Sequence, residues 1–281
     1  MSVKIIACST ADLPQHFEKK IIKVPLTVSF GDESFLDGVT ITHEEFYEKL
    51  KTCEHFPITS QPSPTAFQTE YEKILADGDT AVVVTISSKL SGSYQSALIA
   101  AKGYEDKIFV VDSYTASVGE GVLCMYALDL AEQGKTAAEI AAIIEKEKKH
   151  VNMLAILDTM DYLLKGGRIS KTKAVVGKVL SIKVVVGILE GKVEMLNKAR
   201  GSKHASQFSN AFIEKSGGVN FTMPFLLGYA GVDPENLQKY LEQSQDTWKM
   251  PIAEFDYAPM GSVIGSHAGP GAYVIGFFSK H

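Results

Sequence analysis

Three short polar clusters stand out from otherwise apolar surroundings and hold the residues best suited to chemistry. They are residues 59–64 (Thr-Ser-Gln-Pro-Ser-Pro), residues 87–93 (Ser-Ser-Lys-Leu-Ser-Gly-Ser) and the glycine-rich residues 261–271, which include His267. The first two precede predicted helices, whose free amides and dipole suit an anion, and their hydroxyls can donate further hydrogen bonds. The pattern predicts an anion-binding α/β protein, although the same residues also serve as ordinary helix caps and turns.

A serine hydrolase is the alternative from a different class. Ser91 or Ser93, at a strand-to-helix junction, resembles a nucleophile, with His267 as its base and Asp112 or Asp158 to orient the imidazole. The sequence before Ser91 lacks the first glycine of a GxSxG motif, which weighs against this hypothesis. A regulatory or purely structural role without any ligand is a third possibility.

Cofactor and metal signals are missing from the sequence. The three cysteines, Cys8, Cys53 and Cys124, form no CxxC pair, and no HExxH motif occurs. No GxGxxG motif follows a predicted strand, so no dinucleotide is expected. The unpaired cysteines argue against a disulfide framework and a structural zinc site, and they favour reduced thiols in a cytoplasmic protein.

Composition narrows the class further. The 281 residues are 45% hydrophobic and carry 28 basic against 33 acidic side chains, for a net charge of −5. Such a chain can bury a sizeable core, and the charge balance argues against disorder and against a nucleic-acid footprint. No stretch approaches the roughly 18 apolar residues that a membrane-spanning helix needs. We therefore expect a soluble globular protein.

The elements that position these clusters alternate between strand and helix in the first half of the chain. Buried strands are predicted at residues 3–8, 22–28, 80–86 and 107–111. Capping boxes at Thr42–Glu45 and Thr136–Glu139 predict two helix starts, and Ser63 followed by Pro64 predicts another. Further helices are expected at 92–101 and 117–132. This alternation predicts a parallel sheet with helices on both faces.

The second half has a different pattern. Residues 182–189 and 193–199 flank Glu190-Gly191, which predicts a hairpin. Helices near 203–215 and 234–248 separate strands near 221–229 and 252–257, so we expect a mixed sheet with helices. The change of pattern predicts an α/β domain at 1–158 and a second α/β domain at 159–281, whose carboxyl end could pack back on the first.

Taken together, the clusters resemble the DegV family over about residues 3–280. The matching segments occur in the family's order and cover nearly the whole chain. They are residues 9–14 (Ser-Thr-Ala-Asp-Leu-Pro), 24–26 (Val-Pro-Leu), 37–38 (Asp-Gly), 59–64, 87–92, 112–113 (Asp-Ser), 161–163 (Asp-Tyr-Leu), 166–170 (Gly-Gly-Arg-Ile-Ser), 199–201 (Ala-Arg-Gly) and 265–272 (Gly-Ser-His-Ala-Gly-Pro-Gly-Ala).

The resemblance implies a two-domain protein that holds one long-chain fatty acid, similar to palmitate or oleate, in an internal tunnel. The FakB subunit of bacterial fatty acid kinase is of this kind. It is not itself catalytic, and it presents the carboxylate to a separate ATP-binding kinase subunit that forms an acyl-phosphate. The implied partners are the fatty acid and that kinase subunit, without nucleic acid, membrane span, metal or further cofactor, although transient contact with a membrane surface is compatible with this role.

The same resemblance assigns roles to individual residues. Thr59 and Ser91 would anchor the carboxylate, with Ser60 and Gly92 adjacent and His267 in the polar network around it. Two basic residues, Arg168 and Arg200, would lie near the headgroup or on the face that docks the kinase.

The chain departs from the family at two places. Cys8 stands where an aspartate usually precedes the serine, and Gly201-Ser202-Lys203 replaces the frequent Gly-Arg or Gly-Lys.

Overall fold

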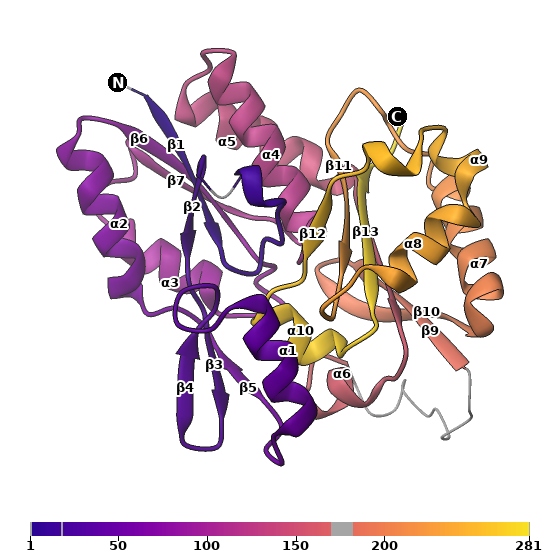
Figure 1. The fold of residues 1–281 in the computed structure, drawn as a ribbon. Coiled ribbons are helices and arrows are strands. Elements are labelled where there is room, and N and C mark those ends of the chain that lie inside the picture. The colour runs from indigo at the N-terminus through magenta and orange to yellow at the C-terminus, as the bar shows by residue number, and fades with distance from the viewer. Residues whose placement is uncertain (1, 18, 170–181, 281) are drawn as a thin grey trace.

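A four-stranded parallel sheet forms the amino-terminal part of the computed structural model, which describes residues 2–17, 19–169 and 182–280 (Figure 1). Its strand order is β2 (Ile21–Val24), β1 (Val3–Cys8), β6 (Thr80–Thr85) and β7 (Ile108–Asp112). Helices α2 (Pro64–Ala76) and α3 (Ser93–Ala100) cover one face, and α4 (Val118–Glu132) and α5 (Ala137–Glu147) cover the other. The predicted three-layer α/β/α arrangement is confirmed.

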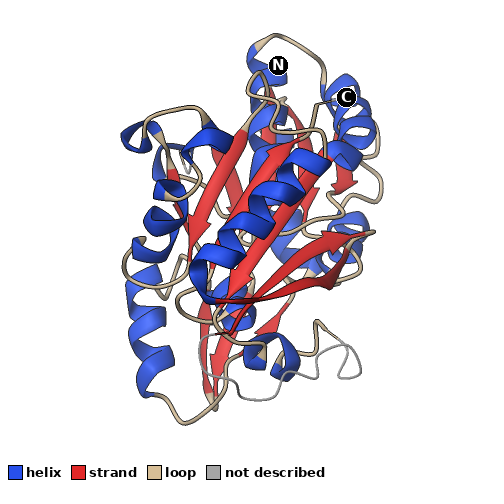
Figure 2. Cartoon of the chain, turned by 90° about the vertical axis from the view of Figure 1, so that its right-hand side faces the viewer, coloured by secondary structure: helices blue, strands red, loops and turns tan. Residues whose placement is uncertain are grey.

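A six-stranded mixed sheet lies opposite. Its order is β10 (Lys192–Arg200), β9 (Ile182–Leu189), β8 (Val151–Leu157), β13 (Tyr273–Phe278), β11 (Phe225–Tyr229) and β12 (Tyr257–Pro259). Neighbouring strands are antiparallel except the β11–β12 pair, and β9 and β10 form the predicted hairpin. The outer face packs against α7 (Gly201–Lys215), α8 (Glu235–Glu242) and α9 (Gln245–Trp248), and Figure 2 shows helices lying across it.

Helix α4 joins the two sheets into one core. It packs against β1 and β6 on one side and against β8, β11 and β13 on the other. Its first residue, Val118, lies so close to the mixed sheet that a Cβ on Gly228 or Gly276 would meet Val118 atoms at about 3 Å. Two glycines in neighbouring strands therefore allow the sheet to approach the helix.

A third, small sheet corrects the prediction of one strand at 22–28. The chain leaves the parallel sheet at Pro25 and enters β3 (Thr27–Phe30), which lies between β4 (Glu33–Leu36) and β5 (Ile58–Ser60) in an antiparallel sheet. Proline has no amide hydrogen for a ladder bond, which is consistent with a break here. Helices α1 (His43–Thr52) and α10 (Ser262–Ala268) pack beside this sheet, and α6 (Asp161–Lys165) packs on α10.

Several predicted boundaries shift. The helix near 234–248 is divided into α8 and α9, and the strand near 252–257 is a 3₁₀ turn at Ile252–Glu254 followed by β12. Two more 3₁₀ turns lie at Gln15–Phe17 and Lys148–His150. Both capping boxes are present, with the Thr42 and Thr136 hydroxyls accepting from the amides of Glu45 and Glu139. Ser170, the last residue of the 166–170 segment, lies outside the described residues.

The sheets divide the chain earlier than residue 158. Strand β8 belongs to the mixed sheet, so the chain has already crossed to that sheet at Val151. Helix α10, far along the chain, packs against α1 and β3 of the first 60 residues. The domain boundary at residue 158 stays a prediction. In space, elements from before and after this residue belong to the same sheet or pack on one another. Within the described ranges, every helix is too short or too polar to cross a bilayer.

Candidate functional site

An internal cavity of about 770 Å³, including its opening, lies between the two large sheets. One wall is the inner face of the mixed sheet, where alternate residues of each strand point the same way. The other wall follows the carboxyl ends of β6 and β7 together with α10, where a parallel sheet is expected to offer a ligand site. The apolar lining includes Leu26, Ile86, Met153, Ala155, Leu157, Leu163, Val186, Ile188, Val193, Val263, Ile264, Ala268 and Val274.

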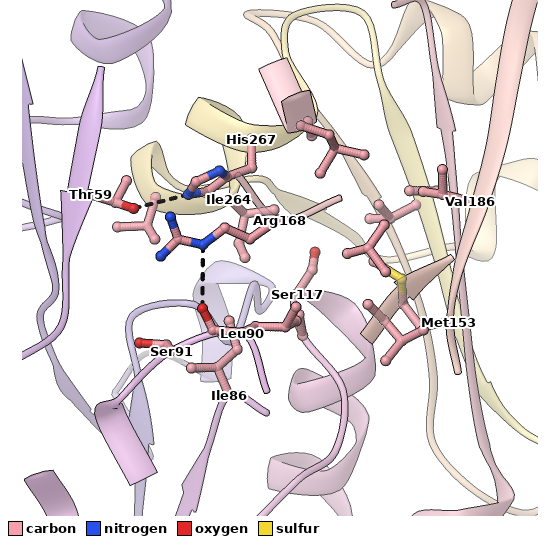
Figure 3. A pocket seen from close by; sticks show the side chains of 18 of the residues that line it. Thr59, Ile86, Leu90, Ser91, Ser117, Met153, Arg168, Val186, Ile264 and His267 are labelled. Atoms are coloured by element: carbon pink, nitrogen blue, oxygen red, sulfur yellow. Dashed lines mark hydrogen bonds between the residues drawn. The ribbon is translucent and has the colours of Figure 1, made fainter. Parts of the chain in front are cut away.

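Polar groups gather at one end of this cavity, as Figure 3 shows. Thr59 of β5 and His267 of α10 face each other, with 2.9 Å between Thr59 Oγ1 and His267 Nε2. Arg168 lies beside them, and Ser91 lies across the opening. Met153 and Val186 line the far side, so the cavity is apolar in depth and polar at its opening.

The surroundings of His267 favour one arrangement of protons. Within the described residues, its buried Nδ1 atom has no hydrogen-bond partner. A bare lone pair at Nδ1 is less costly than an orphaned N–H, which places the proton on Nε2 as a donor to Thr59 Oγ1. The Thr59 hydroxyl then keeps its own hydrogen for an anion in the cavity.

His267 is held in its neutral form. Burial, together with the positive charge of Arg168, lowers the pKa of His267 to about 4. The ring fits because Gly166 has no side chain, since a Cβ there would overlap His267 Nδ1. The glycine at the end of α6 is therefore part of the site.

Ser91 lies between β6 and α3. Its Oγ is 2.9 Å from Ser93 Oγ and accepts from the Ser93 amide at 3.3 Å. Gly92 is the N-cap of α3 and lines the outer depression at the opening; a Cβ there would overlap the Gln61 amide group. The absence of a side chain at residue 92 lets the segment carrying Thr59 approach the start of α3.

Arg168 is anchored by backbone carbonyls. Its Nε donates to Leu90 O at 3.3 Å, and one terminal nitrogen donates to Gly166 O at 2.8 Å. Half-burial lowers the pKa of the guanidinium, which nevertheless keeps its charge. Arg168 borders both the cavity and the shallower depressions outside it, so this cation stands where the cavity meets solvent.

The structure brings together six of the seven predicted residues. Thr59, Ser60, Ser91, Arg168 and His267 line the cavity, and Gly92 lines the depression outside it. Arg200 does not line the cavity. It is exposed at the junction of β10 and α7, where its carbonyl faces His204 Nδ1 at 2.9 Å.

The geometry does not support the serine hydrolase alternative. His267 faces Thr59, whereas Ser91 and Ser93 face each other. In the described part of the chain, no carboxylate contacts His267 Nδ1. The Asp112 carboxylate instead accepts from the amides of Ser88 and Tyr114, while Asp158 pairs with Lys183.

Two polar residues of the cavity were missed by sequence reasoning. Ser117 lines the cavity just before α4 and has a positive φ of 56°, which no local sequence pattern signals. Gln61 reaches from the first cluster to Ser96, to which its amide donates at 3.0 Å. The ranges 2–17, 19–169 and 182–280 contain no group of three or more His, Cys, Asp or Glu side chains able to hold a metal ion.

The departure at Cys8 lies behind Ser91, because the Cys8 thiol contacts the Ser93 hydroxyl, whose oxygen is 2.9 Å from Ser91 Oγ. Cys8 is fully buried at the end of β1, and it does not line the cavity. Burial and the nearby Glu120 carboxyl raise the pKa of its thiol, which is therefore neutral. A neutral thiol, in place of the family's usual carboxylate, thus lies behind the Ser91–Ser93 pair.

These features define an α/β protein with a parallel and a mixed sheet around an apolar cavity that ends in hydroxyl, imidazole and guanidinium groups. The DegV family model, described as an uncharacterised protein family, matches residues 2–280. The chain belongs to the DegV family.

Similar proteins include several named for fatty acids. A fatty acid-binding protein of Thermotoga maritima is 34% identical, with 99% of this chain and 97% of the relative covered. A solved DegV family protein from Thermus thermophilus, described by its fatty acid binding, has a TM-score of 0.87 at 31% identity with both chains fully covered. The Streptococcus pneumoniae Fatty Acid Kinase (Fak) B3 protein, loaded with linoleic acid, has a TM-score of 0.86 at 26% identity, again with full coverage of both chains.

Proposed function

We propose that this protein binds one long-chain fatty acid in the cavity and presents its carboxylate to a separate ATP-dependent kinase subunit, which forms the acyl-phosphate. The observation that carries the proposal is the division of the cavity into an apolar interior and a polar opening. The Thermus and Streptococcus structures, which share the whole fold, support the same class of ligand.

The apolar interior supplies most of the affinity. Burying about 15 methylene groups at roughly 0.8 kcal/mol each gives a gross gain of about 12 kcal/mol before the costs of ordering. The lining of the cavity interior is mostly apolar, as an alkyl chain requires. A long-chain fatty acid similar to palmitate or oleate is the expected ligand.

The polar opening determines which end of the ligand stays near solvent. A buried, unpaired carboxylate would cancel much of the gain from the tail. Thr59 and Ser91 can each donate to the carboxylate, and hydrogen bonds to a charged group contribute roughly 1.5–3 kcal/mol each. Hydroxyl donors also leave a carboxylate oxygen free to attack a phosphoryl group, unlike a bidentate clamp.

Transfer of the phosphoryl group needs a partner, because acyl-phosphate formation consumes ATP. Arg168 stands at the opening, where a transferred phosphoryl group would add negative charge that a cation can stabilise. The exposed Arg200 is suited to docking the kinase, and the protein itself would be a non-catalytic subunit. Such a carrier would act in the cytoplasm, where ATP is available, and would collect its ligand by transient contact with a membrane surface.

Mass spectrometry of an organic extract of the purified protein tests the proposal. We expect about one fatty acid per chain, and we expect delipidated protein to take up added palmitate or oleate. Protein that is free of lipid and also refuses both acids would contradict the proposal. Covalent labelling of Ser91 or Ser93 by a fluorophosphonate, with turnover of esters, would instead restore the hydrolase hypothesis.

A further inference from the structure

Two buried aspartates from distant parts of the chain meet at the start of α10. Asp12 Oδ1 accepts from the Gly261 amide at 2.8 Å. Asp37 Oδ1 accepts from both the amide of Ser262 at 2.8 Å and its hydroxyl at 2.6 Å. Both carboxyl groups are almost fully buried, and both belong to segments, 9–14 and 37–38, that the cavity does not explain.

Two aromatic side chains of α1 contact the backbone just before α10, at the carbonyl group of Met260. The oxygen of Met260 faces His43 Nδ1 at 2.9 Å and accepts from Tyr47 Oη at 3.2 Å. The other ring nitrogen of His43 faces Gly231 O at 2.5 Å. Four side chains, Asp12, Asp37, His43 and Tyr47, thus fix three consecutive residues, and we call them the α10 clasp.

What the clasp holds is the helix that carries His267. Helix α10 has only seven residues, and so short a helix is not stable without outside contacts. The clasp fixes its first residue, Ser262, five residues before His267. One face of α10, including Ile264, also lines the cavity.

The clasp also touches the cavity directly. Ser117 lines the cavity, and its hydroxyl donates to Asp12 Oδ2 at 2.5 Å. Ser117 holds a left-handed conformation with a φ of 56°, which costs energy in a residue other than glycine. The hydrogen bond to Asp12 helps to stabilise that conformation, so one carboxyl group connects the start of α10 with Ser117 in the cavity lining.

We infer that Asp12 and Asp37 are positioning residues for the fatty acid headgroup, acting through α10 to keep His267 within hydrogen-bond distance of Thr59. The inference rests on the proposed function for its ligand. The part of the inference that concerns the placement of His267 does not depend on the ligand, because it rests on the contacts between the clasp and α10.

The test compares Asp37→Ala with Asp37→Asn. The alanine variant removes the acceptor of two hydrogen bonds, whereas asparagine keeps an oxygen at the same place. We would measure the imidazole NMR signals of His267, together with the affinities for palmitate and for methyl palmitate, which lacks the carboxylate. Asp37→Ala should displace the His267 signals. It should also lower the affinity for palmitate about tenfold more than the affinity for methyl palmitate, as expected for the loss of one hydrogen bond to a charged group. Asp37→Asn should keep the His267 signals and the ratio of the two affinities of the wild type, although its amide nitrogen, at the place of the unpartnered Oδ2, should lower the unfolding free energy.

Controls separate positioning from general damage. Thr136→Ala removes a helix cap of α5, away from the cavity, and should change neither the His267 signals nor the ratio of the two affinities. If Asp37→Ala does not fold, Ser262→Ala gives the same test with a smaller displacement, because it removes one of the two bonds. Unmoved His267 signals, or equal weakening of acid and ester, would overturn the inference. If the wild-type protein bound neither palmitate nor its methyl ester, the proposed function would be wrong. The His267 signals of the ligand-free variants would still show whether the clasp positions His267.

Discussion

At the scale of single residues, the cavity opening combines neutral donors with one fixed cation. Thr59, Ser91 and His267 carry no charge at neutral pH, and among the described residues that line the cavity itself Arg168 is the ionised one. A carboxylate can therefore be held by hydrogen bonds that orient it without neutralising it. The affinity should then depend on the hydroxyls individually and on the protonation of His267.

Replacement of Ser91 by alanine should weaken the binding of palmitate by roughly 10- to 150-fold, because one hydrogen bond to the carboxylate is lost. Calorimetric titration of delipidated protein measures the change. Ser88→Ala is the matched control, since Ser88 lies in the outer depression but not in the cavity. Equal affinities of the Ser91 variant and the wild type would refute the assignment of Ser91.

The low pKa of His267 makes a prediction for stability. Its pKa is about 4 in the folded protein and near 6.5 in the unfolded chain, so the unfolded chain takes up more protons between these values. The free energy of unfolding therefore has its full value with respect to His267 above pH 6.5. It falls by at most about 3 kcal/mol as the pH is lowered to 4.

Urea unfolding at pH 7 and at pH 4.5 tests this linkage. The loss of unfolding free energy on acidification should be smaller in His267→Gln than in the wild type. Ser88→Ala, which changes no titratable side chain, should leave the loss unchanged. A wild-type pH dependence in the His267 variant would show that the imidazole is not held neutral.

At the scale of elements, α6 and α10 must approach closely for the site to form. Gly166 ends α6 with ordinary helical torsion angles, so alanine would be unstrained there but for the His267 ring. Its neighbour Gly167 has a positive φ of 71° and open space around it. An alanine at residue 166 therefore tests crowding of the His267 ring, whereas an alanine at residue 167 tests backbone strain alone.

Gly166→Ala should displace the His267 ring and weaken palmitate binding about tenfold, the equivalent of one hydrogen bond to the carboxylate. Gly167→Ala should lower the unfolding free energy by about 1 kcal/mol through strain, yet leave the affinity intact. Titration and thermal unfolding of both variants provide the measurements. If the two variants lost affinity to the same extent, the fit between Gly166 and His267 would have no role in binding.

Elements with local signals were predictable from the sequence. The capping boxes at Thr42 and Thr136 and the β9–β10 hairpin depend on residues close in the chain, and all are present. Strands β8 and β13 were not predicted, because each is a short apolar run, and such a run alone does not distinguish a buried strand from a buried helix. Helix α10 was expected to be a glycine-rich turn. Gly265 instead lets the helix pack on α1, since a Cβ there would meet the Phe46 ring at 2.7 Å.

The site was predictable to a similar degree. The sequence clusters and the family resemblance identified Thr59, Ser91 and His267, which the fold brings to one opening. The contribution of Ser117 depends on an unusual backbone conformation, and that of Asp37 depends on a contact with Ser262 across 225 positions. Such long-range contacts leave no periodic or local pattern in the sequence.

At the scale of the whole molecule, the cavity and the proposed docking residue Arg200 lie in different places. The cavity lies between the two large sheets, whereas Arg200 lies at the outer junction of β10 and α7. A carrier needs this separation, because its partner must reach the carboxylate without opening the core. Binding of the lipid and its phosphorylation should therefore respond to different substitutions.

Arg200→Ala should keep wild-type affinity for palmitate and, if the proposed docking role is right, should reduce phosphorylation by the partner kinase at least tenfold, because an exposed charge is removed. Lys203→Ala, one turn into α7, shows whether nearby charge alone matters and should have a smaller effect. Binding is followed by titration and phosphorylation by acyl-phosphate formation. Normal phosphorylation of the Arg200 variant would remove this residue from the docking face.

The most direct test of the account is the carboxyl NMR signal of palmitate labelled with ¹³C at its first carbon, added to delipidated protein. We expect one bound carboxyl signal per chain, distinct from that of free palmitate and displaced by Thr59→Ala and by Ser91→Ala. A bound signal that neither substitution moves, or no bound signal at all, would contradict the placement of a fatty acid headgroup at this opening.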